Sequence, residues 1–147
     1  MAEKEEILDI TESSEIERAA EYIRRGDESY KFKIRYRVIN GIPKNGETEV
    51  FRNNESMMES GLLVLDFDQK DNKGLDIRKI YNLFMRNVID WGVVLIERSI
   101  RGNGAHVIVR MVEGMSRTEL TRLFELRTGL KADYRATTLS QALILVP

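Results

Sequence analysis

The chain has 147 residues, enough for one domain with its own core, and 42% of them are hydrophobic while 32% are charged. It has no cysteine, which excludes a disulfide framework and a thiolate metal site. The net charge of -1 hides an asymmetry: residues 1–21 hold eight acids and two bases, so the remainder carries five surplus positive charges. This mildly basic remainder is compatible with an anionic partner. The acidic start is no signal peptide and no apolar run is of membrane-spanning length, so we expect a soluble, cytoplasmic protein with no membrane partner.

The first predicted elements are a helix and a strand. The stretch SSEIERAAEYIRRGD predicts a helix that begins with a capping box, Ser14 with Glu17, and stops at Gly26. The stretch YKFKIRYRVI alternates as a strand does, and its cationic side carries Lys31, Lys33, Arg35 and Arg37. Two interpretations stay open for that side: a solvated face that protects an edge strand, or a nucleic-acid-binding stripe that follows the phosphates.

The next stretch is rich in turn residues, with one short element at 49–52 and a helical turn at 55–59. From Gly61 onward the pattern is firmer: a strand GLLVLDFD, a helix LDIRKIYNLFMRNVID, the strands WGVVLIERS and AHVIVRMV, a helix SRTELTRLFELRTG and a closing strand SQALILVP. A second capping box, Ser116 with Glu119, starts the last helix, and Gly129 ends it. Residues 1–147 are therefore predicted to form one α+β domain, with a ferredoxin-like (RRM-like) βαββαβ core at 61–147 and an N-terminal helix and strand extension at 1–60. Because the chain stops directly after a strand, we expect it to be the N-terminal part of a longer protein.

Asp66 and Asp68 end a strand of four aliphatic residues, where a buried strand has no use for carboxylates. Right-handed crossovers place the first and third strands of such a core side by side. The aliphatic residues should face the helices, which leaves both aspartates on the open face beside His106 and Arg110. Asp133 leads into the fourth strand, which is expected on the other side of the first. Three carboxylates, the single histidine and an arginine are thus predicted to converge.

Two carboxylates one strand step apart are a common way to hold Mg²⁺ or Mn²⁺, which prefer oxygen ligands. The structural alternative is that both residues only turn the chain into the loop DQKDNKG. Gly102 and Gly104 precede the histidine and either bring backbone amides close to phosphate oxygens or form an ordinary hairpin turn. The absence of a GxxxxGK[ST] segment excludes a P-loop ATPase.

These segments resemble the motifs of the archaeo-eukaryotic primase (primase-polymerase) superfamily. LLVLDFD matches its hhhDhD motif, and RSIRGNGAHVIVR resembles its glycine-rich turn that ends in histidine. ADYRATTLSQALILVP looks like its third motif, with Asp133 as the acid. The resemblance runs from about Tyr30 to Pro147 and is closest to the primase-like N-terminal domains of virulence-associated protein E-type mobile-element proteins.

The resemblance implies a metal-dependent nucleotidyltransferase that adds nucleotides on a single-stranded DNA template during replication of a mobile element or phage. In that family pattern the catalytic residues are Asp66, Asp68 and Asp133, which hold Mg²⁺ or Mn²⁺, and His106, which contacts the phosphates of the nucleoside triphosphate. We expect Gly102, Gly104 and Arg110 to take part in binding the nucleotide as well. A helicase domain C-terminal in the same chain is the implied partner. Arg101 and Gln141 differ from the serine and arginine of the pattern, which keeps open a catalytically weakened nucleic-acid-binding domain of a replication protein. A ferredoxin-like domain that binds a small regulatory ligand is a further alternative.

Overall fold

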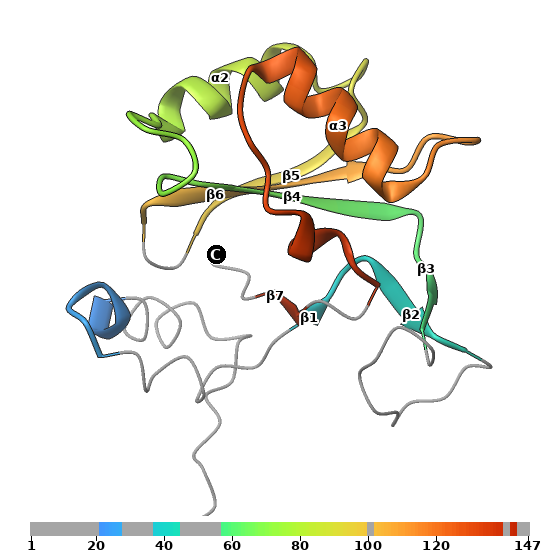
Figure 1. The fold of residues 1–147 in the computed structure, drawn as a ribbon, viewed down its shortest axis with the longest axis horizontal. Coiled ribbons are helices and arrows are strands. Elements are labelled where there is room, and N and C mark those ends of the chain that lie inside the picture. Colours follow the sequence, from blue (N-terminus) through green and yellow to red (C-terminus); the bar gives the residue numbers. More distant parts are fainter. Residues whose placement is uncertain (1–20, 28–36, 45–56, 100–101, 140–141, 144–147) are drawn as a thin grey trace, which may run out of the picture.

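The computed structural model describes residues 21–27, 37–44, 57–99, 102–139 and 142–143. Within them the fold is α+β, as predicted, with helices on one side of a three-stranded sheet (Figure 1). Residues 21–24 are helical, and Gly26 follows with a φ of 100°, which agrees with the predicted stop of the first helix. Its capping box lies outside the described residues.

The main sheet has the strand order β4-β6-β5, and both of its pairings are antiparallel. Its strands are β4 (Leu62–Asp68), β5 (Val93–Arg98) and β6 (Gly104–Arg110). The prediction that the first and third strands of the core are neighbours in the sheet is therefore confirmed. The register sets Asp66 opposite His106 and Asp68 opposite Gly104, so both aspartates pair with the first half of β6.

Two helices cover one face of this sheet (Figure 1). They are α2 (Ile77–Arg86) and α3 (Arg117–Thr128), and the predicted capping box and glycine stop of α3 are both present. The core lies between sheet and helices, where Leu63, Leu65 and Phe67 of β4 are fully buried against a cluster that includes Phe84 and Phe124. The aliphatic side of β4 thus faces the helices, as expected. The helix α2 is shorter than predicted because Asn87 caps it.

The end of the chain departs from the predicted arrangement. Over its described residues, β7 (Ala142–Leu143) pairs with β1 (Arg37–Val38) and not with β4. The segment beside β4 is instead the short helix η4 (Tyr134–Thr137). The expectation of an open second face is therefore wrong along part of β4. Val64 and Ile108 are apolar residues on that face, and burying them requires a covering layer.

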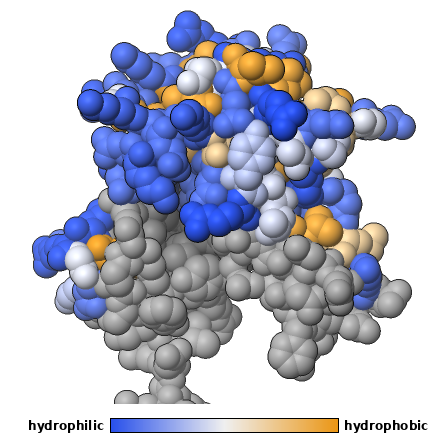
Figure 2. Space-filling view, viewed as in Figure 1, coloured by the Kyte–Doolittle hydropathy of each residue, from blue (hydrophilic) through white to orange (hydrophobic). Residues whose placement is uncertain are grey.

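A small antiparallel sheet joins β2 (Gly41–Pro43) to β3 (Met57–Glu59). The predicted helical turn at 55–59 is therefore wrong for its last three residues, because pairing with β2 overrides a weak local preference. On the face shown in the space-filling view, most described residues are hydrophilic, and hydrophobic residues gather over the helices and near β2 and β3 (Figure 2). Ile89, which follows α2, and Leu126 of α3 are hydrophobic residues that are largely exposed.

Candidate functional site

Three polar side chains form a row across the main sheet, one from each strand. Asp66 of β4 lies opposite His106 of β6, and His106 lies opposite Glu97 of β5. The Nε2 atom of His106 is 3.6 Å from Oδ1 of Asp66, and its Nδ1 atom is 3.0 Å from Oε1 of Glu97. The predicted proximity of Asp66 and His106 is therefore present in the structure.

Glu97 was not among the predicted site residues, although its position holds a clear signal. It is a carboxylate inside the otherwise apolar run VVLIE, and it is only 8% exposed. A buried carboxylate is costly unless it is paired. The same reasoning that singles out Asp66 in its own strand thus applies to Glu97.

Asp66 lies in a partly buried position among other acids. Burial raises the pKa of its carboxyl group; the His106 ring opposes this rise, and the nearby carboxylates of Asp133 and Asp68 add to it. Carboxylates that raise the pKa of a neighbouring acid mark a place where a cation would be stabilised.

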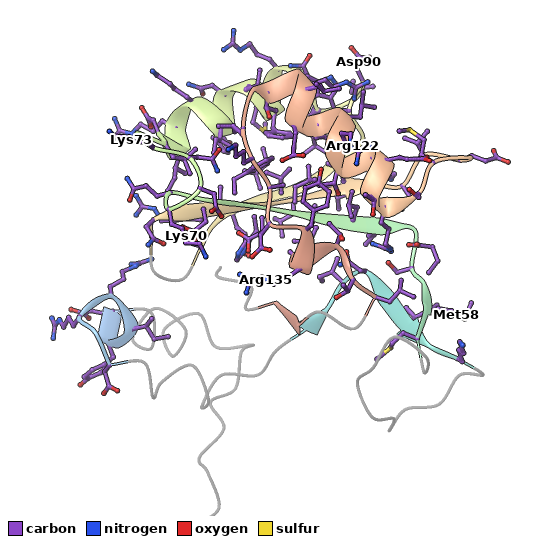
Figure 3. All side chains as sticks on the ribbon, viewed as in Figure 1. Met58, Lys70, Lys73, Asp90, Arg122 and Arg135 are labelled. Carbon is purple, nitrogen blue, oxygen red and sulfur yellow. The ribbon has the colours of Figure 1, made fainter. Side chains whose placement is uncertain are left out.

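Asp133 lies next to β4, as predicted, but its carboxylate already has a partner. Its backbone N–H donates to the carbonyl oxygen of Asp66 over 2.8 Å, and this bond places the residue beside the row. The guanidinium of Arg135 donates to both Asp133 oxygens, over 3.2 and 3.0 Å, and these hydrogen bonds lower the pKa of the Asp133 carboxyl group. Arg135 lies on the side of the sheet away from Asp90 and Arg122, which lie with the helices (Figure 3).

Asp68 takes part in the turn that follows β4. One of its carboxylate oxygens accepts a hydrogen bond from the N–H of Lys70 over 2.9 Å, which is the chain-turning role of the structural alternative. Its side chain stays partly exposed. A carboxylate has two oxygens and several lone pairs, so this bond leaves room for a further ligand.

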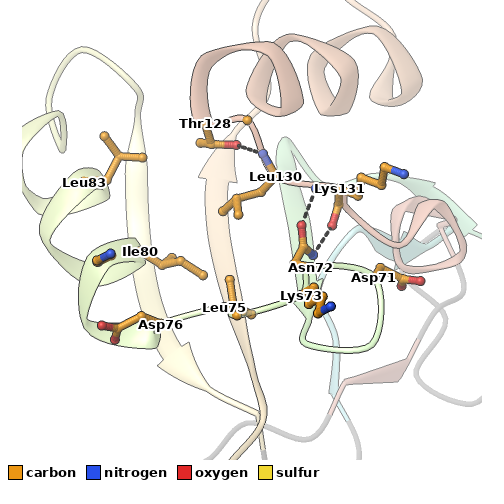
Figure 4. Close-up of a pocket in the computed structure, with 13 residues that line it drawn as sticks. Asp71, Asn72, Lys73, Leu75, Asp76, Ile80, Leu83, Thr128, Leu130 and Lys131 are labelled. Carbon is orange, nitrogen blue, oxygen red and sulfur yellow. Dashed lines mark hydrogen bonds between the residues drawn. The ribbon is translucent and has the colours of Figure 1, made fainter.

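Two asparagines that the sequence reading missed attach the segment of Asp133 to β4. Asn72 donates to the carbonyls of Asp68 and Lys131 and accepts from the N–H of Lys131, as Figure 4 shows for the pair with Lys131. Asn40 is 1% exposed; it accepts from the N–H of Val64 and donates to the carbonyls of Ala136 and Thr138. Asparagine in a loop is common, so the sequence alone gives no sign of these roles.

The glycine turn before His106 is a close-packed hairpin. Gly102 has a φ of 80°, and its N–H donates to the carbonyl of Ser99 over 2.8 Å. A Cβ atom at Gly104 would lie 2.7 Å from the carbonyl oxygen of Phe67, so glycine is needed there for strand contact. Gly102 also lines a cavity of about 390 Å³ together with Arg78 and Arg98. The backbone of the turn therefore requires its glycines. Its two cationic neighbours are Arg78 and Arg98.

The remaining predicted site residues are more distant or not described. Arg110 shares a face with His106, but it lies four residues further along β6, opposite Leu62, which is roughly 13 Å away along a strand. Lys31, Lys33 and Arg35 fall outside the described residues. The backbone of Arg37 belongs to β1.

A second cavity, of about 440 Å³, opens between the start of α2 and the end of α3 (Figure 4). Its lining includes Asn72, Lys73, Lys79 and Lys131, and none of the predicted metal-binding acids. In the described ranges, no group of three or more histidine, cysteine, aspartate or glutamate side chains is arranged to hold a metal ion. None of the helices in the same ranges has the length and apolar character needed to cross a bilayer.

Comparisons of the chain with protein-family models, with curated proteins and with solved structures find no match. A functional proposal therefore depends on the arrangement of the side chains and on the motifs that the sequence displays.

Proposed function

We propose that the chain is a primase-polymerase-like nucleotidyltransferase domain that adds nucleotides on a single-stranded DNA template. The observation that carries the proposal is the group of polar residues at the end of β4. Asp66 lies beside His106, Asp68 follows two residues further along, and the backbone N–H of Asp133 donates to the carbonyl of Asp66. The strand order β4-β6-β5, with both helices on one face, is what a ferredoxin-like core has in three of its strands.

The donor set fits a hard divalent cation. Mg²⁺ is usually bound by one or two carboxylates, with water and substrate phosphates completing its shell. Asp66 and Asp68 offer two carboxylates on one side of β4, and burial, followed by the nearby carboxylates of Asp133 and Asp68, raises the pKa of Asp66. A bound Mg²⁺ or Mn²⁺ would neutralise charge on the transferred phosphoryl group. The chain's own contribution is to hold these oxygens and the His106 ring on rigid strands.

The experiment is a titration with Mn²⁺ and a nucleoside triphosphate, followed by a nucleotide-addition assay on primed and unprimed single-stranded DNA. Changing both Asp66→Asn and Asp68→Asn should abolish coupled binding of metal and nucleotide, together with nucleotide addition. Asp90→Asn is the matched control, because Asp90 is an exposed acid that lies with the helices (Figure 3). Unchanged coupled binding in the double variant contradicts the proposed site.

A second candidate function is a nucleic-acid-binding domain of a replication protein with weakened catalysis. The pairing of Asp133 with Arg135 favours it, because a carboxylate held at both oxygens is a poor metal ligand. In that case the wild-type protein binds single-stranded DNA but adds no nucleotide with either Mg²⁺ or Mn²⁺. His106→Ala would then change affinity alone, whereas in the enzyme it should lower turnover by about 10²–10³ with template affinity preserved.

A further inference from the structure

The pair Glu97 and His106 carries an inference about where the histidine ring holds its proton. Both side chains are almost inaccessible, with exposures of 5% for Glu97 and 10% for His106. The distance of 3.0 Å between Oε1 and Nδ1 is that of a hydrogen bond. An ionised carboxylate can only accept, so Nδ1 must be the donor and carry a proton.

The other ring nitrogen is in a different situation. Nε2 is 3.6 Å from Oδ1 of Asp66, which is too long for a hydrogen bond. Because the bond made by one ring nitrogen fixes the tautomer, the neutral ring carries its lone pair on Nε2. Nε2 points toward the end of β4 where Asp66 and Asp68 lie. Glu97 therefore orients the ring from the far side of β6.

We propose that Glu97 is a positioning residue: by accepting from Nδ1 it holds the His106 ring in one orientation and one tautomer, with Nε2 turned toward the group that binds beside Asp66. The catalytic part of this inference rests on the proposed function, in which that group is a triphosphate. In this proposal Glu97 acts on the site through its hydrogen bond to His106.

The tautomer can be measured directly, because the chain contains a single histidine. Labelling histidine with ¹⁵N gives one pair of ring-nitrogen signals, whose shifts and couplings identify the protonated nitrogen. At a pH that leaves the ring neutral, we expect the proton on Nδ1 in the wild-type protein. A neutral ring with its proton on Nε2 in the wild type overturns the proposal without any need for a variant.

Two variants of Glu97 test whether the acceptor at this position sets the tautomer of His106. Glu97→Ala removes the acceptor and should move the proton to Nε2, the tautomer that prevails for free histidine in water. Glu97→Gln keeps the size and a carbonyl acceptor, so it should retain the Nδ1 proton and keep the fold if the alanine variant does not fold. Glu113→Gln is the control, since Glu113 is exposed in the loop after β6. A glutamine variant with its neutral ring protonated on Nε2 would contradict the role of the acceptor.

The kinetic arm distinguishes this inference from the proposed function. If the wild type adds nucleotides, Glu97→Ala should lower kcat about 10-fold to 100-fold with little change in KM, as loss of an orienting partner does, while Glu97→Gln should retain most of the activity. An unchanged kcat in Glu97→Ala overturns the positioning role in catalysis. If the wild type adds no nucleotide while Nδ1 carries the proton, the proposed function fails and the orientation of His106 by Glu97 stands.

Discussion

The side chain of Asn72 exchanges two hydrogen bonds with the backbone of Lys131, a residue 59 positions further along the chain. The same amide group donates to the carbonyl of Asp68. One side chain therefore connects the end of β4 to the segment that leads to Asp133. The two halves of the candidate site are held in place by a residue with no predicted chemical role.

Replacing Asn72 by alanine should lower the free energy of unfolding by about 2–3 kcal/mol. The change leaves a carbonyl and an N–H of Lys131 without their partner in a partly buried place, and each such loss is costly. Chemical denaturation measures the effect. Asn82→Ala is the control, because Asn82 is exposed on α2 and alanine favours a helix. Equal stability of the two variants would show that the Asn72 bonds contribute nothing.

Asp66→Asn should stabilise the protein at neutral pH by about 1 kcal/mol. Burial raises the pKa of the Asp66 carboxyl above its value in the unfolded chain, so the folded state binds a proton more readily. The ionised group therefore destabilises the fold above this raised pKa, and that penalty disappears as the pH falls toward the usual value of 3.8.

Unfolding curves of the wild type and Asp66→Asn, recorded from neutral to acid pH, test this sign. The stability advantage of the asparagine variant should shrink on acidification. An advantage that grows toward low pH, or a variant that is less stable at neutral pH, would mean that His106 stabilises the carboxylate more than burial destabilises it.

Arg135→Gln should strengthen Mn²⁺ binding beside Asp66, because it removes a cation that lies against the Asp133 carboxylate. It should also raise the pKa of the Asp133 carboxyl, because hydrogen bonds from Arg135 are the main reason that this pKa is low. Arg86→Gln serves as the control, since Arg86 is exposed on α2. Identical Mn²⁺ affinities in both variants would exclude Asp133 from any cation site.

The basic stretch that precedes β1 makes a separate prediction about nucleic acid. If Lys33 and Arg35 contact phosphates, changing both to glutamine should reduce the slope of log affinity against log salt for single-stranded DNA by about 1.4. The control pair is Lys73→Gln with Lys79→Gln, at the cavity between the helices. Equal slopes for both double variants would leave Lys33 and Arg35 as solvated charges.

The sequence was informative wherever a local rule decides the structure. The capping box at Ser116 and the αL glycine at 129 mark the two ends of α3, and both are present. The alternation of β4 separates Leu63, Leu65 and Phe67 from the aspartates, and burial follows that pattern. The strand order and the alternation of side chains predict that Asp66 and His106 share one face of neighbouring strands, and the register of β4 with β6 sets them opposite each other.

Features that depend on distant segments could not be predicted in this way. The attachment of the segment around η4 to β4 depends on Asn40, which accepts from the N–H of Val64 and lies 96 positions before its other partner, Ala136. The neutralisation of Asp133 by Arg135 depends on a side-chain direction that the sequence spacing leaves open. Glu97 could have been predicted as a site residue, because a carboxylate buried in an apolar strand is costly unless it is paired.

The bonds of Asn40 also bear on the order in which the molecule folds. They close a loop of 96 residues, and a contact between such distant positions forms only after the entropy of closing the loop has been overcome. The sheet and its two helices are built from much nearer segments, so they should gain protection against hydrogen exchange first. The segment around η4 should dock later and open more readily at equilibrium. Asp133 would then leave and rejoin Asp66 without any unfolding of the core, so the acidic cluster is complete for only part of the lifetime of the folded protein.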